Sequence, residues 1–204
     1  PELQGKVAVI TGAGRHKGLG EAMAKRLAQE GCKVIITDLA QAHGEHMPES
    51  AICTSDEMNQ IVEEIKAAGG EASACACNVL DPDSVQAAVQ FAVDTYGKLD
   101  IWVNNAGIGY LMKPILEMDV AEWDSVINVN LRGTFYGIKF AAEQMVKQGN
   151  GGKIINIGSQ ASKSAFAHAS AYTTSKHGMN GLTRVAAQEL GAEGINVNQI
   201  CPNH

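Results

Sequence analysis

The sequence VAVITGAGRHKGLG at residues 7–20 predicts a strand, a tight turn and a helix in direct succession. The apolar residues Val7 to Ile10 fit a buried strand, glycines follow at once, and a helical spacing of apolar residues begins after Gly20. Glycines let the backbone approach a ligand closely, and the first amides of a helix attract an anion. The segment therefore indicates a βα unit whose turn suits a diphosphate.

The glycine spacing separates the possible nucleotide motifs. Lys17 is followed by Gly18, where a P-loop has serine or threonine, and Lys17 also stands where GxGxxG counted from Gly12 needs its third glycine. The spacing GxxxGxG fits from Gly14 through Gly18 to Gly20. A glycine-rich turn alone also serves plain packing of a strand against a helix, so other residues must decide its use.

The rest of the chain repeats the βα rhythm. Further strands are expected at residues 34–37, 72–79, 101–103, 154–157 and 195–200, and helices at residues 21–29, 57–68, 84–96, 123–146 and 171–190. Expected left-handed C-caps follow these helices at Gly31, Gly69, Gly97, Gly149 and Gly191. The alternation predicts a Rossmann-like α/β fold of three layers, with a doubly wound parallel sheet, as a single domain over residues 1–204.

Composition and charge narrow the functional classes. A chain of 204 residues with 45% hydrophobic residues can bury one sizeable core, and its formal charge of −6 argues against nucleic-acid binding. No apolar run approaches the roughly 18 residues that cross a bilayer. The polar start at Pro1–Lys6 lacks the layout of a secretory leader, so no membrane contact and a cytoplasmic location are expected. Five cysteines, an odd number without CxxC spacing, indicate free thiols.

Residues 40–55 interrupt the rhythm and are expected to form an insertion that is longer than a usual βα loop. His43, Glu45 and His46 lie within it, but no third ligand stands at a helical or hairpin spacing from the two histidines. We therefore predict that the chain holds no metal.

Polar residues mark the carboxyl ends of two predicted strands. Asp38 ends the second strand, 20 residues after Gly18, where a dinucleotide fold places an acid that accepts a hydrogen bond from a ribose 2′-hydroxyl. The segment Asn104–Gly107, NNAG, ends the fourth strand at the sheet edge where open α/β folds bind ligands. Its two asparagines also suit a structural role in satisfying backbone groups, and both interpretations can hold together.

Ser159, Tyr172 and Lys176 complete the candidate site. Ser159 follows a strand, and Tyr172 and Lys176 lie four residues apart on the next helix, which places their Cβ atoms roughly 5–6 Å apart on one face. An ammonium so close to a phenol favours the phenolate, so Tyr172 could exchange a proton with an alcohol or carbonyl oxygen while hydride moves to or from a nicotinamide. Such a pair by itself is usually a solvated helix face, but the glycine turn, Asp38 and NNAG favour the catalytic interpretation.

Together these motifs resemble the short-chain dehydrogenases/reductases, in the ordinary-length branch of that superfamily. The resemblance covers essentially all 204 residues and is carried by the glycine turn at Thr11–Gly20, NNAG at Asn104–Gly107, and YxxxK at Tyr172 and Lys176. A looser form of the family's TGxxxGxG turn is present, because this turn is two residues longer. Whether Gly12 or Gly14 takes the role of the first glycine is therefore open.

The resemblance implies a role for each site residue. Ser159, 13 positions before the tyrosine, would orient the substrate oxygen, and Tyr172 would be the general acid/base. Lys176 would also hold the nicotinamide ribose, and Asn130, from an NxxG stretch, would position a water that leads to Lys176. The implied substrate contacts are Ser159, Gln160 and Tyr172. The implied cofactor contacts are Gly12, Gly14, Arg15, Gly18, Leu19, Gly20, Asp38, Leu39, Asn78, Val79, Asn105, Ala106, Gly107, Tyr172, Lys176 and Pro202.

The sequence therefore predicts an oxidoreductase that transfers a hydride between NAD(H) and a secondary alcohol or ketone. NAD is favoured over NADP because Asp38 would repel a 2′-phosphate, although Arg15 and Lys17 could attract one. An alternative is a non-catalytic dinucleotide-binding or regulatory protein on the same scaffold. The sequence does not identify the substrate, whose candidate lining residues include 108–111 and 166–168.

Two further expectations concern assembly and chain length. Helices at 131–146 and 171–190 carry more small and apolar residues than one buried stripe needs, which predicts a homo-oligomer, and the resemblance implies a homotetramer built on these helices. The family usually has aspartate at Asn78, proline-glycine at Pro202–Asn203, and a substrate loop and last strand after the position of His204. We therefore expect the functional protein to continue beyond His204.

Overall fold

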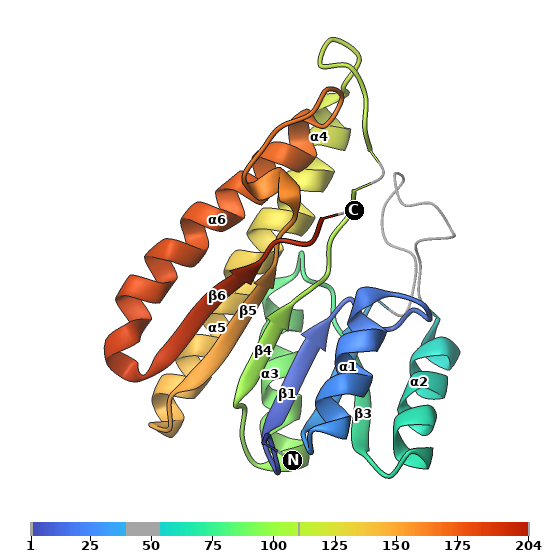
Figure 1. The fold of residues 1–204 in the computed structure, drawn as a ribbon, viewed down its shortest axis with the longest axis vertical. Coiled ribbons are helices and arrows are strands. Elements are labelled where there is room, and N and C mark those ends of the chain that lie inside the picture. The colour runs from blue at the N-terminus through green and yellow to red at the C-terminus, as the bar shows by residue number, and fades with distance from the viewer. Residues whose placement is uncertain (1, 40–53, 110, 204) are drawn as a thin grey trace.

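The computed structural model describes residues 2–39, 54–109 and 111–203, and its centre is one six-stranded sheet (Figure 1). The strands are β1 (Val7–Thr11), β2 (Lys33–Asp38), β3 (Glu71–Ala76), β4 (Ile101–Asn104), β5 (Gly152–Ile157) and β6 (Ile195–Ile200). They pair in the order β3-β2-β1-β4-β5-β6, and every pairing is parallel. The winding direction reverses between β1 and β4, which confirms the predicted doubly wound fold.

Helices cover both faces of the sheet and complete three layers. They are α1 (Leu19–Gln29), α2 (Ser55–Ala67), α3 (Pro82–Tyr96), α4 (Val120–Ile127), α5 (Gly133–Gln148) and α6 (Ser170–Leu190). Helices α1 and α2 pack on one face, and α3, α5 and α6 pack on the other (Figure 1). None of the helices in the described ranges is both long and apolar enough to cross a bilayer.

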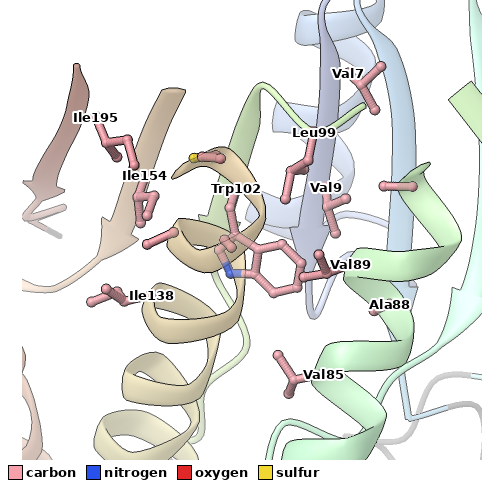
Figure 2. Packing of buried hydrophobic residues seen from close by; sticks show 14 of the residues in the cluster. Val7, Val9, Val85, Ala88, Val89, Leu99, Trp102, Ile138, Ile154 and Ile195 are labelled. Atoms are coloured by element: carbon pink, nitrogen blue, oxygen red, sulfur yellow. The ribbon is translucent and has the colours of Figure 1, made fainter. Parts of the chain in front are cut away.

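The larger core lies under α3, α5 and α6, and Trp102 of β4 is at its centre. Figure 2 shows the indole ring of Trp102 between Val89 of α3 and Ile138 of α5. Trp102 is fully buried, so its ring removes a large apolar area from water. Its indole N–H donates to Asn104 Oδ1 over 2.7 Å, so the one polar atom of this ring is satisfied.

Several predicted boundaries were wrong. The third strand ends at Ala76 rather than at residue 79, because the chain turns before α3, where the Ser84 hydroxyl accepts from the amide of Asn78. The helix expected at 123–146 is α4 and α5 joined by a π-helical turn at Asn128–Arg132. Gly191 is not a left-handed cap, since a short 3₁₀ turn continues α6 and Gly194 takes the positive φ of 71°.

Only the end of the expected insertion at residues 40–55 is described. Thr54 caps α2 by accepting from the amide of Glu57 over 3.1 Å, so α2 begins at Ser55, two residues before its predicted start. His43, Glu45, His46 and Cys53 lie outside the described residues.

Candidate functional site

The first part of the site is the glycine turn between β1 and α1, at the point where the winding direction reverses. Gly12 has a φ of 64°, and a Cβ built on it would lie 2.6 Å from Ala106 Cα. A Cβ on Gly20 would lie 2.6 Å from Ala13 Cα. Glycine is therefore required at both positions, and the role of the first glycine falls to Gly12.

Gly14 has a different role: its backbone amide connects the glycine turn to the end of β2. Its amide donates to Asp38 Oδ2 over 3.0 Å, and the amide of Leu39 donates to Asp38 Oδ1 over 2.8 Å. Burial raises the pKa of Asp38, while these two hydrogen bonds oppose the rise. The Asp38 carboxyl group is thus held at the end of β2, where the sequence predicts a ribose contact.

The NNAG segment binds the loop after β4 to the end of β1. The Asn105 side chain donates to the carbonyl oxygens of Thr11 and Gly12, each over 2.8 Å. The Thr11 hydroxyl accepts from the amides of Asn105 and Ala106, each over 3.1 Å. Six polar groups are satisfied in this way, so the two loops that flank the reversal point are bound to each other.

The remaining asparagine of this segment, Asn104, also has a structural role, but it bonds side chains, whereas Asn105 bonds backbone groups as the structural interpretation of the sequence expected. Its side chain accepts from Trp102 and donates to Asn156 Oδ1 over 2.8 Å. Asn156 in turn donates to the Thr183 hydroxyl over 2.9 Å. This buried chain of side-chain hydrogen bonds joins β4, β5 and α6.

Between these loops lies a cavity of about 340 Å³. Most of the predicted cofactor residues line it, namely Gly12, Arg15, Gly18, Leu19, Gly20, Asp38, Leu39, Asn78, Val79, Asn105, Ala106 and Gly107. The predicted contacts Gly14, Tyr172, Lys176 and Pro202 do not line it. The α1 N-terminus and the Asp38 carboxyl group at this cavity together fit a dinucleotide.

Sequence reasoning missed several lining residues: His16, Cys77, Leu80 and Val129. His16 could have been found, because it lies inside the glycine turn. Cys77 and Leu80 flank Asn78 and Val79 in the loop after β3, where the predicted strand ran too far. Val129 belongs to the π-helical turn, which has no local sequence signature.

Lys176 is a deeply buried cation beside Tyr172. It is 5% exposed, its Nζ donates to the carbonyl oxygen of Ile157 over 2.7 Å, and its Nζ lies 5.7 Å from the centroid of the Tyr172 ring. Burial lowers the pKa of Lys176 to about 8. The Tyr172 ring is also close to the loop after β4, since a Cβ built on Gly109 would lie 3.2 Å from Tyr172 Cε2.

Asn130 lies in the π-helical turn and is fully buried. Its Oδ1 accepts from the amide of Ile108 over 2.8 Å, and its Nδ2 donates to the Ile108 carbonyl over 2.9 Å and to the Ser175 hydroxyl over 3.1 Å. A Cβ built on Gly107 would lie 3.2 Å from Asn130 Oδ1 and 3.8 Å from Lys176 Nζ. The structure therefore brings Asn130 and Lys176 together beside Gly107.

Ser159 and Gln160 lie on the turn that follows β5. The Ser159 hydroxyl accepts from the amide of Ala161 over 3.1 Å, and the Gln160 amide donates to the carbonyl oxygen of Pro202 over 2.8 Å. Pro202 thus contacts this turn rather than the cofactor cavity. Because Lys176 is bonded to Ile157, two residues before Ser159, the lysine and the serine turn share the carboxyl end of β5.

The chain is similar to known dehydrogenases over nearly its whole length. The family model described as short chain dehydrogenase matches residues 6–52 and 50–204. The cyclohexanol dehydrogenase of Acinetobacter sp. (strain SE19) is 36% identical over 203 residues, which is 100% of this chain and 74% of that protein. The 2-dehydro-3-deoxy-D-gluconate 5-dehydrogenase of Escherichia coli (strain K12) is 36% identical over 202 residues, covering 99% of this chain and 72% of that protein.

A solved structure is similar over the same region. Carveol dehydrogenase from Mycobacterium avium, in complex with NAD, superposes with a TM-score of 0.91 and 31% sequence identity. The superposition covers 98% of this chain and 71% of that one.

Proposed function

The chain belongs to the short-chain dehydrogenase family, and we propose that it is an NAD-dependent oxidoreductase that interconverts a secondary alcohol and its ketone. The observation that carries the proposal is the buried Lys176 ammonium beside the Tyr172 ring, at the strand edge next to the cofactor-sized cavity. A solvated helix face does not bury a lysine to 5% exposure.

NAD is the cofactor in this proposal. Support comes from Asp38, which is held at the end of β2 by two backbone amides, and from the related carveol dehydrogenase that binds NAD. The glycine turn and the first amides of α1 would hold the diphosphate, and Asp38 the adenosine ribose. When bound, the nicotinamide supplies or accepts the hydride.

In the proposed reaction Tyr172 exchanges a proton with the substrate oxygen, and Ser159 orients that oxygen. The Lys176 Nζ lies 5.7 Å from the centroid of the Tyr172 ring and is held in place by the carbonyl oxygen of Ile157. Asn130 acts through position: its side chain makes three bonds to Ile108 and Ser175, which fix the loop after β4 against α6. The expected role of Asn130 in holding a water for Lys176 stays a prediction.

The body of the substrate is proposed to be apolar. The loop after β4 and the segment before α6 lie side by side, joined by a bridge between Lys113 and Ala169. They expose Met112, Ile115 and Phe166, which are 42%, 74% and 48% exposed. A panel of cyclic and acyclic secondary alcohols with NAD⁺, followed by NADH absorbance, tests this, and sugar acids serve as the polar comparison.

The decisive experiment is Tyr172→Phe, which keeps the ring and removes the hydroxyl. We expect kcat to fall by about 10²-fold or more, because a positioned acid/base contributes that much, while the dissociation constant of NADH stays within about twofold. A variant that keeps more than a tenth of the wild-type kcat contradicts the assignment. If the wild type neither turns over any alcohol nor binds NADH, the proposal that the chain is an NAD-dependent oxidoreductase is wrong.

A homotetramer is part of the proposal. Helices α5 and α6 leave a surface hollow of about 480 Å³, lined by apolar residues such as Phe135, Ile138, Val146, Leu182 and Val185. Phe135 and Val185 are 45% and 52% exposed, and large exposed apolar patches usually mark interfaces. A monomer in light scattering at micromolar concentration would contradict the proposed homotetramer.

The cytoplasmic location and the continuation of the protein beyond His204 stay predictions.

A further inference from the structure

Two residues of the lengthened glycine turn, His16 and Lys17, are bound by carboxylates from two different helices. The amide of His16 donates to Glu57 Oε1 of α2 over 2.7 Å, and the amide of Lys17 donates to Glu21 Oε2 of α1 over 2.5 Å. Both His16 and Lys17 line the cofactor cavity. Lys17 has a φ of 60°, a left-handed conformation that lysine rarely adopts, so these bonds hold a turn that would otherwise relax.

Glu21 is itself fixed by charge. It is 9% exposed, and its side chain contacts the Lys25 ammonium over 2.7 Å and the His16 ring over 3.1 Å. Burial would raise the pKa of Glu21, but the hydrogen bonds from Lys25, His16 and the Lys17 amide outweigh it and lower the pKa to about 2. Lys25 also donates to Glu64 of α2 over 2.6 Å, so α1 and α2 are joined around the turn.

This cluster includes three residues at metal-ligand distances, His16, Glu21 and Glu64. The Lys25 ammonium bonds to both carboxylates, so a cation of this chain already occupies the place between them. We therefore interpret the cluster as an ion-pair network that stabilises the turn, and we assign it no metal.

We propose that Glu57 is a positioning residue for cofactor binding: from α2 it holds the His16 amide, so that the lengthened glycine turn is preformed at the cavity. The inference rests on the proposed function, since it needs a dinucleotide in that cavity. Glu57 comes three residues after the N-cap Thr54, and the Glu57 amide is the donor to that cap. The start of α2 and the cofactor turn are thus one connected unit.

A simple charge argument makes the opposite prediction, which sharpens the test. Removing a carboxylate near an anionic diphosphate should tighten its binding if only charge matters. Removing the acceptor that holds the turn should weaken binding, because the turn must then be ordered when the cofactor binds. The sign of the change in NADH affinity therefore separates positioning from charge.

The experiment is a fluorescence titration of NADH with the purified protein, which needs no substrate. Glu57→Ala is expected to raise the dissociation constant about tenfold, the effect of losing one hydrogen bond to a charged group. Glu57→Gln keeps an acceptor for the His16 amide and is expected to stay within about twofold of the wild type. The control is Glu63→Ala on the same helix, which removes an exposed acid ion-paired with Lys66, and it should leave the affinity unchanged.

Hydrogen exchange of the His16 amide gives a second readout that does not depend on NADH. The exchange should become faster in Glu57→Ala and stay slow in Glu57→Gln, while thermal unfolding shows that each variant is folded. The inference is overturned if Glu57→Ala binds NADH as tightly as the wild type or more tightly, or if Glu57→Gln weakens binding as much as Glu57→Ala does. A wild type that does not bind NADH would instead reject the proposed function.

Discussion

Replacing Lys176 by methionine should change how the stability of the protein depends on pH. Burial lowers the pKa of Lys176 from 10.5 to about 8, so between these values the unfolded chain binds a proton that the folded chain does not. Stability then rises with pH, because it increases wherever the unfolded state holds more protons. Below pH 8 both states are protonated, and the folded state bears the full cost of burying the charge.

The magnitude follows from the size of this shift. At about 1.4 kcal/mol per pKa unit, the wild type should gain about 2 to 3 kcal/mol of stability from pH 7 to pH 10, relative to the methionine variant. Methionine has a similar length and does not titrate. The hydrogen bond to the Ile157 carbonyl is stronger from the ammonium than from the neutral amine, and this difference is already contained in the folded-state pKa of Lys176.

The assay is urea unfolding of both proteins at pH 7 and pH 10. Titrating groups far from Lys176 are shared, so subtracting the free energy of unfolding of the variant from that of the wild type leaves the contribution of Lys176 and of its neighbour Tyr172. If this difference is the same at the two pH values, Lys176 titrates alike in the folded and unfolded states. The burial that underlies the proposed role of this lysine would then be wrong.

Two other substitutions test the cofactor cavity. Asp38→Ala should raise kcat/KM with NADPH relative to kcat/KM with NADH, because it removes the charge that repels a 2′-phosphate. A wild-type preference for NADPH, or no relative gain in the variant, would mean that Asp38 does not contact the ribose. Gly20→Ala should weaken NADH binding and lower stability by about 1–3 kcal/mol, because its Cβ would lie 2.6 Å from Ala13 Cα. The matched control is Gly181→Ala in α6, where a Cβ meets no described atom within 4 Å, and it should raise the melting temperature. An equal loss of stability in both variants would contradict the close approach at Gly20.

The sheet could be predicted because its signals are local. Apolar runs, glycines and helical spacing mark each βα unit, and parallel strands place their carboxyl ends at one edge. Asp38 and Asn105 therefore line the same cavity although neither is near the other in sequence. This placement needs only the common carboxyl edge of a doubly wound parallel sheet, which the sequence predicts.

Contacts between distant side chains could not be predicted in the same way. The bond between His16 and Glu57 joins residues 41 positions apart, and no periodicity relates them. The π-helical turn at Asn128–Arg132 could not be predicted from the sequence either. It packs against α6, and Asn130 within it bonds to Ile108 and Ser175, which are distant in the sequence. Asn130 was found only because it fits a family motif.

Helix α6 shows why Tyr172 and Lys176 could be identified in the sequence and their attachment to β5 could not. Tyr172, Lys176 and Thr183 lie four and seven residues apart, so they share one face of the helix. Lys176 donates to the carbonyl of Ile157, and Thr183 accepts from Asn156, so two polar bonds from this face reach adjacent residues of β5. The position of the Tyr172 ring is thus set by β5, the strand that also leads into Ser159. Bonds this deeply buried are costly to break, and they hold Tyr172 and Ser159 on one common support.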